Sequence, residues 1–311
     1  MKHAIVYSSL ARPVEMPPEA AARHKKVQEA DPDNPSPEEK LERLSRILQG
    51  CGRLAVAFSG GVDSTFLLAF AKEVIPDRVF AITASAPNFS PEETEEAAAF
   101  CGEHGIKQLS VALDWEFMNG FSHNPPNRCY LCKKAIFSRL TEAAEENGAT
   151  CVADGTNADD VSDYRPGLAA LSELGVRSPL REAGLTKEEI RRALRERGLP
   201  AWSKPAFACL ASRIPYYEKI TPEKLQAVYV LEKEVRRLGF PQCRVRHHGS
   251  VARIEVLPED RRRFAEPSVM DSVNELALRA GFSYAALDLA GYKMGSLNSR
   301  LDEKENSKNG G

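Results

Sequence analysis

The segment LAVAFSGGVDSTFLLAF, residues 54–70, limits how the chain can fold more than any other part of the sequence. It joins a short apolar run of strand length, a turn with two glycines, and a helical pattern that we expect to begin near Asp63 or Ser64. Glycines at such a turn let the backbone approach an anion, and the helix N-terminus offers free N–H groups and the positive end of its dipole. The segment therefore predicts a phosphate-binding loop. Its candidate ligands are Ser59, Gly60, Gly61 and Ser64.

This loop is not one of the two commonest phosphate-binding motifs. It lacks the lysine of GxxxxGK[ST], and its glycine spacing is not that of GxGxxG. The alternative interpretation is that SGG is only a tight turn between a strand and a helix.

Strand-like and helical patterns alternate along the first two thirds of the chain. The apolar runs VFAIT, KQLSVAL and TCVADG alternate with the helical patterns EETEEAAAFCGEHG and KKAIFSRLTEAAEENG. Such alternation predicts an α/β fold with a doubly wound, mainly parallel sheet. We place this domain at 37–200 and a smaller α+β domain at 201–295, with a mobile arm at 1–36 and a disordered tail at 296–311.

Length, charge and hydropathy narrow the class of protein. A chain of 311 residues suits two domains of ordinary size. With 42 Lys and Arg against 44 Asp and Glu the net charge is −2, so the chain has no basic footprint and we expect no nucleic-acid partner. Because no apolar run approaches the roughly 20 residues of a membrane helix and no signal segment is recognisable, we expect no membrane association and a cytoplasmic location.

The motif SGGVDS resembles the signature of the PP-loop ATP pyrophosphatase superfamily, over residues from about 38 to 200. The members of that superfamily bind the pyrophosphate part of ATP and transfer AMP to a substrate oxygen. The resemblance implies ATP and Mg²⁺ as cofactors, with Asp63 near the metal and the triphosphate. TCVADGTNADD resembles the later loop that closes the nucleotide site, which implies roles for Asp154, Gly155 and Asn157. A helix cap or Asx turn is the alternative for Asp154.

Three of the seven cysteines stand apart from the other four. Cys129 and Cys132 lie in NRCYLCKK, where a helix N-terminus and three basic residues are expected to favour thiolates, and Cys209 lies in the turn-rich KPAFACLASRIP. The other cysteines, Cys51, Cys101, Cys151 and Cys243, fall in element-like patterns and are interpreted as small hydrophobic residues. No second CxxC or spaced histidine pair completes a zinc site. Three thiolates are one fewer than usually hold a [4Fe–4S] cluster, so one iron would be left to carry hydrosulfide, while an incidental or reducible thiol pair is the alternative.

Four segments in order make the chain similar to the LarE family of PP-loop sulfur transferases, over residues from about 38 to 295: SGGVDS, DGTNADDVSDYRPG, ACLASRIPY and RVRHHGSVARIEV. The resemblance implies that ATP adenylates a carboxylate of pyridinium-3,5-biscarboxylate mononucleotide and that sulfur then gives a thiocarboxylate, for the nickel-pincer cofactor of lactate racemase. One branch of the family takes sulfur from the position of Cys209 and leaves dehydroalanine. A second branch carries a CxxC and a [4Fe–4S] cluster, and RCYLCK matches that branch, which implies Cys129, Cys132 and Cys209 as cluster ligands.

The same resemblance implies a substrate site on basic residues. A mononucleotide with a phosphate and two carboxylates needs cations, and the matching family positions are Ser212, Arg213, Arg244 and Arg246. Trp202 and Lys204 lie beside the same loop and are further candidates. A solvated strand face is the alternative for the two strand arginines. Family members form homo-oligomers, often hexamers, and use a sulfide source as a second partner.

Two other functions fit parts of the pattern. A tRNA thiolase of the PP-loop class also combines SGGxDS with three cysteines, but it should carry a basic RNA-binding face. A nucleotide-binding sensor with a structural metal would bind ATP without releasing AMP and pyrophosphate.

Overall fold

The structure is a computed structural model that describes residues 35–161, 166–204 and 209–293. By its contacts the chain divides into Met1–Ser36 and Pro37–Gly311, and every element described below belongs to the second part. Apart from residues 35 and 36, the arm expected at 1–36 and the tail expected at 296–311 lie outside the described residues.

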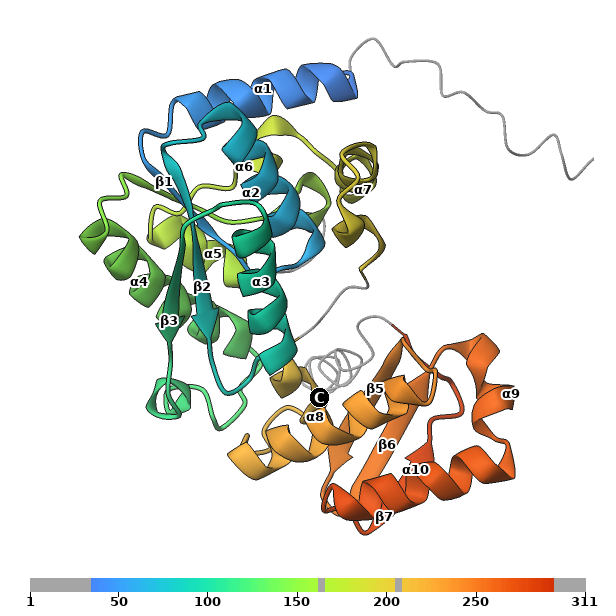
Figure 1. The fold of residues 1–311 in the computed structure, drawn as a ribbon. Coiled ribbons are helices and arrows are strands. Elements are labelled where there is room, and N and C mark those ends of the chain that lie inside the picture. Colours follow the sequence, from blue (N-terminus) through green and yellow to red (C-terminus); the bar gives the residue numbers. More distant parts are fainter. Residues whose placement is uncertain (1–34, 162–165, 205–208, 294–311) are drawn as a thin grey trace, which may run out of the picture. The chain divides into compact units, whose positions relative to one another are not determined.

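A four-stranded parallel sheet organises the first half of this part (Figure 1). Its spatial order is β3-β2-β1-β4, so the strand that leads into the glycine turn is an inner strand. This confirms the predicted α/β fold with a parallel sheet. The strands are β1 (Leu54–Ala57), β2 (Val79–Ser85), β3 (Gln108–Ala112) and β4 (Cys151–Ala153).

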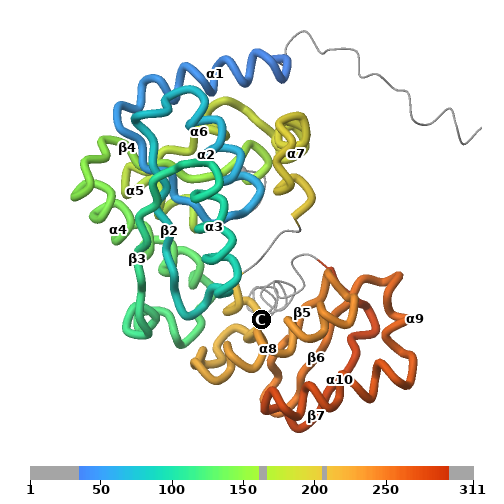
Figure 2. Tube along the Cα trace, in the orientation of Figure 1, coloured from blue at the N-terminus to red at the C-terminus, as the bar shows by residue number. Residues whose placement is uncertain are grey.

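Helices cover both faces of this sheet, as a doubly wound fold requires. Successive strand residues point to opposite faces: Leu54 and Val56 pack in one core with residues of α1, α2 and α7, whereas Ala55 packs in another with residues of α4. The path of the chain between the layers can be followed in Figure 2. The helices are α1 (Pro37–Gln49), α2 (Val62–Val74), α3 (Pro91–Glu103), α4 (Arg128–Glu146), α5 (Pro166–Glu173), α6 (Pro179–Ala183) and α7 (Lys187–Glu196).

Local sequence explains where two of the helices begin. Thr186 caps α7 in a full capping box, in which its side chain accepts from the backbone of Glu189 and the Glu189 carboxylate accepts from the backbone of Thr186. The helix α2 differs, because its N-cap is Gly61 and no side chain caps it. The start of α2 is therefore left open for a ligand rather than closed by its own sequence.

A second, mixed sheet forms the C-terminal part, with the order β5-β6-β7. The first two strands are antiparallel, as expected, and β7 pairs parallel to β6. The strand β7 was not predicted: its apolar run, YAAL, is only four residues long, and its side chains alternate between exposed and half-buried. The elements are α8 (Pro222–Arg237), β5 (Cys243–His248), β6 (Val251–Val256), α9 (Arg261–Phe264), α10 (Pro267–Arg279) and β7 (Tyr284–Leu287).

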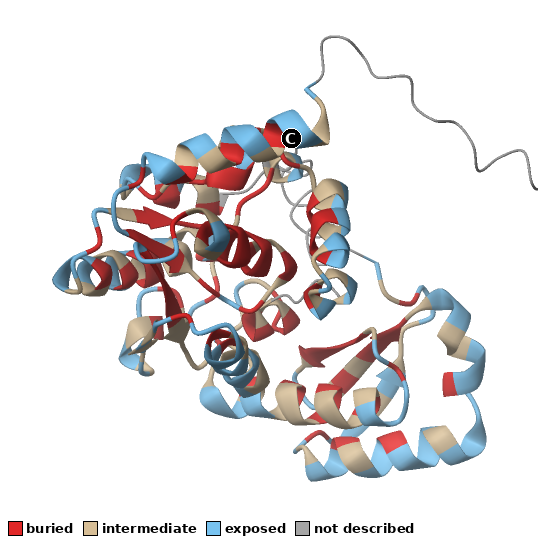
Figure 3. Cartoon of the chain, turned by 45° about the horizontal axis from the view of Figure 1, so that its top comes forward, coloured by how far each residue is buried: buried red, intermediate tan, exposed pale blue. Residues whose placement is uncertain are grey.

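The C-terminal sheet has its own apolar core, to which the first half of the chain contributes. Met118 and Phe121 are buried in it with residues of α8, β5 and β6. Figure 3 shows buried residues along inner strands of the two sheets, such as β1 and β6, and along α2. The domain boundary near residue 200 remains a prediction, since Pro37–Gly311 forms one unit by its contacts. None of the helices within the described ranges is long and apolar enough to cross a membrane.

Five short 3-10 helices complete the described part of the chain. Among them, η5 is the turn that directly follows Cys209. They are η2 (Glu116–Met118), η3 (Ala158–Val161), η4 (Pro200–Ser203), η5 (Leu210–Arg213) and η6 (Pro258–Asp260).

Candidate active site

A pocket of about 770 Å³ lies where β1, β2 and β4 reach their carboxyl ends. This is the edge at which parallel α/β sheets bind their ligands. Among the described residues, the pocket does not include Gly60, Asn157, Arg213, Arg244 or Arg246 in its lining. The predicted site residues that do line it are Ser59, Gly61, Asp63, Ser64, Cys129, Cys132, Asp154, Gly155, Cys209 and Ser212.

The glycine turn is held in an open shape by its own hydroxyl groups. The Oγ atoms of Ser59 and Ser64 lie 3.2 Å apart, Ser64 Oγ donates to the Gly61 carbonyl, and the Gly61 N–H donates to Ser59 Oγ. Gly60 has a φ of +71°, in the left-handed region that favours glycine. The turn is thus shaped by glycine geometry and hydroxyl contacts and leads directly to the uncapped start of α2.

Asp63 lies in the first turn of α2, and its two carboxylate oxygens have different surroundings. Its Oδ2 atom forms an ion pair with Lys187 Nζ, whereas its Oδ1 atom is buried and has no hydrogen-bond partner among the described residues. Burial raises the pKa of Asp63 above its usual value, and the charge of Lys187 only partly opposes this rise. A carboxylate with one buried, unpartnered oxygen fits a Mg²⁺ ligand, because Mg²⁺ prefers oxygen donors.

The loop after β4 touches the glycine turn closely at Gly155. A Cβ atom on Gly155 would lie 2.9 Å from the backbone nitrogen of Ser64 and 3.3 Å from the carbonyl carbon of Asp63. Both neighbours are backbone atoms, so they cannot turn aside as a flexible side chain could. Gly155 is therefore needed for the two loops to meet.

We expect the substitution Gly155→Ala to push the two loops apart, lowering the free energy of unfolding by about 1–3 kcal/mol and impairing ATP-dependent pyrophosphate release. Gly102→Ala is the matched control, because no atom lies within 4 Å of a Cβ at that position. Denaturant unfolding and a pyrophosphate assay compare the two variants. Equal stability and activity in both would show that the contact at Gly155 is not tight.

Asp154 and Asn157 hold this second loop together. Asp154 is buried and accepts hydrogen bonds from Ser178 Oγ, at 2.7 Å, and from Thr156 Oγ1. Its Oδ2 atom lies 3.9 Å from Lys133 Nζ, and both residues line the pocket. Asn157 accepts from the backbone N–H of Asp159 at 2.9 Å, the contact of an Asx turn. Asp154 thus faces the site, whereas Asn157 shapes the loop.

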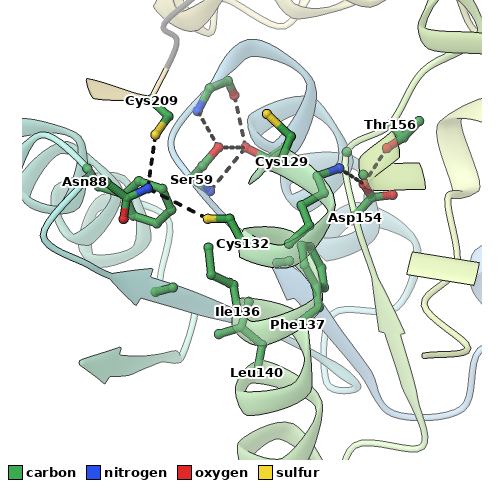
Figure 4. Close-up of a pocket in the computed structure, with 18 of the residues that line it drawn as sticks. Ser59, Asn88, Cys129, Cys132, Ile136, Phe137, Leu140, Asp154, Thr156 and Cys209 are labelled. Carbon is green, nitrogen blue, oxygen red and sulfur yellow. Dashed lines mark hydrogen bonds and ion pairs between the residues drawn. The ribbon is translucent and has the colours of Figure 1, made fainter. Parts of the chain in front are cut away.

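The three cysteines reach this pocket from two different parts of the chain (Figure 4). Cys129 and Cys132 lie at the start of α4, and Cys209 is the residue before η5. The Asn88 amide nitrogen lies 3.0 Å from the Cys209 sulfur and 3.8 Å from the Cys132 sulfur. The structure therefore places two of the sulfurs on either side of one amide group.

One expectation about these thiols is wrong. The basic residues near the CxxC were expected to favour thiolates, but burial raises the pKa of Cys132, and the charges of Cys209 and Cys129 raise it further. Lys134 points elsewhere and pairs with Glu173 at 2.6 Å, while Arg128 donates to the carbonyl of Ala211. Arg128 still lowers the pKa of Cys132, but less than burial raises it.

Three thiols line this pocket, and a thiolate is the kind of ligand that an iron–sulfur cluster needs. Within the described residues, no three His, Cys, Asp or Glu side chains are placed to hold one ion. In a [4Fe–4S] cluster each protein sulfur binds a different iron, so the ligands lie farther apart than those around one ion.

The predicted substrate arginines are buried and ordered by glutamates. Arg213 forms a two-point ion pair with Glu232, at 2.7 and 2.9 Å, and Arg246 forms one with Glu255, at 3.0 and 2.8 Å. Arg244 is also buried and stacks over the Tyr292 ring at 5.2 Å. The alternative of a solvated strand face is therefore wrong.

None of these three arginines is among the described residues that line the pocket. Arg213 and Arg246 instead contact Ser212, in the turn that follows Cys209. Arg213 Nη1 donates to Ser212 Oγ at 2.9 Å, and Arg246 Nη1 donates to the Ser212 carbonyl at 2.9 Å. Ser212 lines the pocket, so it connects the cations to the site. Lys204 instead donates to the Gly60 carbonyl at 3.0 Å and pairs with Glu96, and neither it nor Trp202 lines the pocket among the described residues.

Sequence reasoning missed three pocket or loop residues for which a signal existed. Asn88 closely follows the buried strand β2, at the sheet edge where ligands bind. Lys187 is a cation in the first helical turn of α7, where the helix dipole disfavours positive charge, so a partner elsewhere could have been expected. Lys133 follows the second cysteine of the CxxC and lines the pocket beside Asp154.

Known proteins resemble this chain at two levels. The NAD synthase family model matches residues 44–143, which include the glycine turn and the CxxC. One of the chains of the glutamine-hydrolysing GMP synthase of Pyrococcus furiosus is 25% identical over 65% of this chain and 70% of its own length. The family-model match lies within the half of the chain that carries the parallel sheet.

Two relatives match nearly the whole chain. An uncharacterised protein of Synechocystis is 42% identical, covering 84% of this chain and 97% of its own length. The pyridinium-3,5-bisthiocarboxylic acid mononucleotide synthase of Lactiplantibacillus plantarum is 39% identical, covering 86% of this chain and 96% of its own length. Identity of this extent, together with a parallel sheet that carries the SGGVDS turn, shows that the protein belongs to the LarE-like family of PP-loop ATP pyrophosphatases.

Proposed function

We propose that the protein is an ATP-dependent sulfur transferase that converts a carboxylate of pyridinium-3,5-biscarboxylate mononucleotide into a thiocarboxylate, a step in making the nickel-pincer cofactor of lactate racemase. The observation that carries this proposal is that one pocket contains both a phosphate-binding turn and three cysteines. An enzyme that only hydrolysed or sensed ATP would not need the cysteines there. The similarity to the Lactiplantibacillus plantarum synthase supports this substrate.

The first half-reaction activates the carboxylate. The triphosphate would lie on the glycine turn and the start of α2, with Mg²⁺ on Asp63. The purine would lie against the apolar wall of the pocket that Ile136, Phe137 and Leu140 form. A carboxylate oxygen of the substrate attacks the α-phosphorus, the bond to the β-phosphate oxygen breaks, and pyrophosphate leaves with that electron pair. Lys133 and Lys187 are placed to balance the phosphate charge.

The second half-reaction replaces the activated oxygen by sulfur. A sulfide attacks the carbonyl carbon of the acyl-adenylate, and AMP leaves as the thiocarboxylate forms. We propose that Cys129, Cys132 and Cys209 hold a [4Fe–4S] cluster at this position. When bound, such a cluster supplies an iron without a protein ligand, at which hydrosulfide can be held. The chain's own contribution is to bring the three thiols beside the nucleotide.

A direct assay tests the function. The anaerobically prepared protein, ATP, Mg²⁺, sulfide and the mononucleotide should give AMP, pyrophosphate and a product in which one oxygen is replaced by sulfur, detected by mass spectrometry. Pyrophosphate release that needs the mononucleotide but no sulfide would identify the adenylation step alone. Release of inorganic phosphate without AMP would contradict the assignment.

We expect Arg244→Gln to weaken binding of the mononucleotide by about 1 kcal/mol, through the loss of a positive charge near the pocket rather than of a direct hydrogen bond, with little change in ATP binding. The physical reason is that Arg244, Arg213 and Arg246 provide the positive charge behind the Ser212 turn. Calorimetric titration with each ligand measures both affinities.

Arg262→Gln is the control, since Arg262 is an exposed arginine of α9. Arg246→Gln is a less clear test, because it also removes a buried partner of Glu255 and so should destabilise the fold. Unchanged mononucleotide affinity in Arg244→Gln would move the phosphate site away from this strand.

A further inference from the structure

Asn88 connects the segment after β2 to the Cys209 turn through both its backbone and its side chain. Its backbone carbonyl accepts from the N–H of Leu210 at 3.0 Å, and its side-chain amide lies 3.0 Å from the sulfur of Cys209. Asn88 is fully buried and lines the pocket. Its position relative to Cys209 is therefore set at two points.

The same amide group also reaches the second cysteine segment. Nδ2 lies 3.8 Å from the sulfur of Cys132, which belongs to α4 (Figure 4). A primary amide carries two N–H donors, so one Asn88 can donate to both sulfurs at once. Cys132 and Cys209 come from distant parts of the chain, and this amide is a contact that they share.

The Asn88 amide directs its nitrogen at the two sulfurs and leaves its oxygen without a hydrogen bond among the described residues. Its Oδ1 atom is buried and lacks a hydrogen-bond partner among the described residues, which is unfavourable for a buried carbonyl oxygen. With the amide turned over, Oδ1 would face the two sulfurs, which could then donate only as protonated thiols. In the observed orientation both sulfur atoms act as hydrogen-bond acceptors from the Asn88 amide.

We propose that Asn88 is a positioning residue that holds the Cys132 and Cys209 sulfurs at a fixed separation and donates hydrogen bonds to both. The role of these contacts in catalysis rests on the proposed sulfur-transfer function. The contacts themselves are present in the chain without any cluster. Hydrogen bonds to anionic acceptors are stronger than those to neutral ones, so the contacts should strengthen when the sulfurs act as thiolate ligands.

The first test needs no iron. In apo protein with the background substitution Cys129→Ser, dibromobimane, which bridges two neighbouring thiols, should link Cys132 to Cys209, and peptide mass spectrometry counts the bridged pair. Asn88→Leu keeps the size of the side chain but removes the donors, so we expect bridging to fall about fivefold, the change that corresponds to about 1 kcal/mol for a lost hydrogen bond. Asn147→Leu is the control, since its amide donates to a helix carbonyl instead of a sulfur.

Asn88→Asp is the second variant, in case leucine prevents folding, because it keeps the shape of the side chain but has no donor when ionised. Circular dichroism confirms that each variant is folded. Bridging at the wild-type rate in folded Asn88→Leu or Asn88→Asp would overturn the proposal.

The second test uses protein reconstituted with iron and sulfide. Hydrogen bonds to the sulfurs set cluster potentials, so we expect Asn88→Leu to shift the midpoint potential downward, because the more negative reduced state loses a donor. A residue that only filled space would not move the potential in this direction. An unchanged potential together with unchanged bridging would disprove the role of Asn88.

The two tests also separate this proposal from the proposed function. If no cluster forms in the wild type but bridging still depends on Asn88, the cluster is wrong and the positioning role stands. If the cluster forms and transfers sulfur, but the Asn88 variants have the wild-type bridging rate and midpoint potential, the function stands and the positioning role is wrong.

Discussion

Serine at any one of positions 129, 132 or 209 is expected to abolish both the visible absorbance of the reconstituted protein and the formation of thiocarboxylate, while release of pyrophosphate in the adenylation step continues. The reason is that all three thiols line one pocket, whereas the proposed phosphate site, the glycine turn and the start of α2, contains no cysteine. Loss of one thiolate from a three-thiolate site leaves a second iron without a protein ligand. Absorbance spectra, iron analysis and product mass spectrometry measure the effect.

Cys151→Ser is the matched control, because Cys151 is half-buried like Cys132 and Cys209 but does not line the pocket among the described residues. It should keep the absorbance and the activity. The sacrificial mechanism makes a different prediction: only Cys209→Ser would be inactive, Cys129→Ser and Cys132→Ser would remain active, and the wild type would gain dehydroalanine at position 209. That pattern would replace the cluster with Cys209 itself as the sulfur donor.

Asp63→Asn is expected to lower the rate of pyrophosphate release by about 10²–10³-fold, the range for removing one group that stabilises charge in a transition state. The asparagine keeps the shape of the side chain but loses the charge that would hold Mg²⁺. The buried, unpartnered Oδ1 atom is the structural reason to expect a metal there. A pyrophosphate assay over a range of Mg²⁺ concentrations checks the result.

The fold should survive this substitution, which separates catalysis from stability. Burial raises the pKa of Asp63, so the charged form is disfavoured in the folded protein, and this carboxylate costs stability as the pH rises above its ordinary pKa. A neutral asparagine removes that cost, so the melting temperature of Asp63→Asn at neutral pH should not fall. Lys187→Met removes the ion pair but keeps the carboxylate, and it should retain the Mg²⁺ requirement. An active Asp63→Asn would rule out the metal role.

The order of strands and helices was predictable because periodicity reports which face of an element is buried. The alternation of apolar runs and amphipathic patterns corresponds to a parallel sheet with cores on both faces, to which Leu54 and Ala55 contribute on opposite sides. The strand β7 escaped prediction because its apolar run is only four residues long, and its parallel pairing with β6 cannot be read from so short a segment. Register between distant strands is not a local property of the sequence.

For the candidate site, spacing in the sequence identified the residue types but not their surroundings. The sequence by itself determined the glycine turn and the start of α2, since glycine conformation and helix initiation are local. Only the tertiary structure decided that Lys187 pairs with Asp63, that Asn88 lies between two cysteine segments, and that the strand arginines are buried against glutamates. Burial and charge pairing depend on side chains that come from remote elements, and these also reverse the expected pKa of Cys132. Local physics therefore fixes where the chain turns, and long-range packing fixes what each reactive group touches.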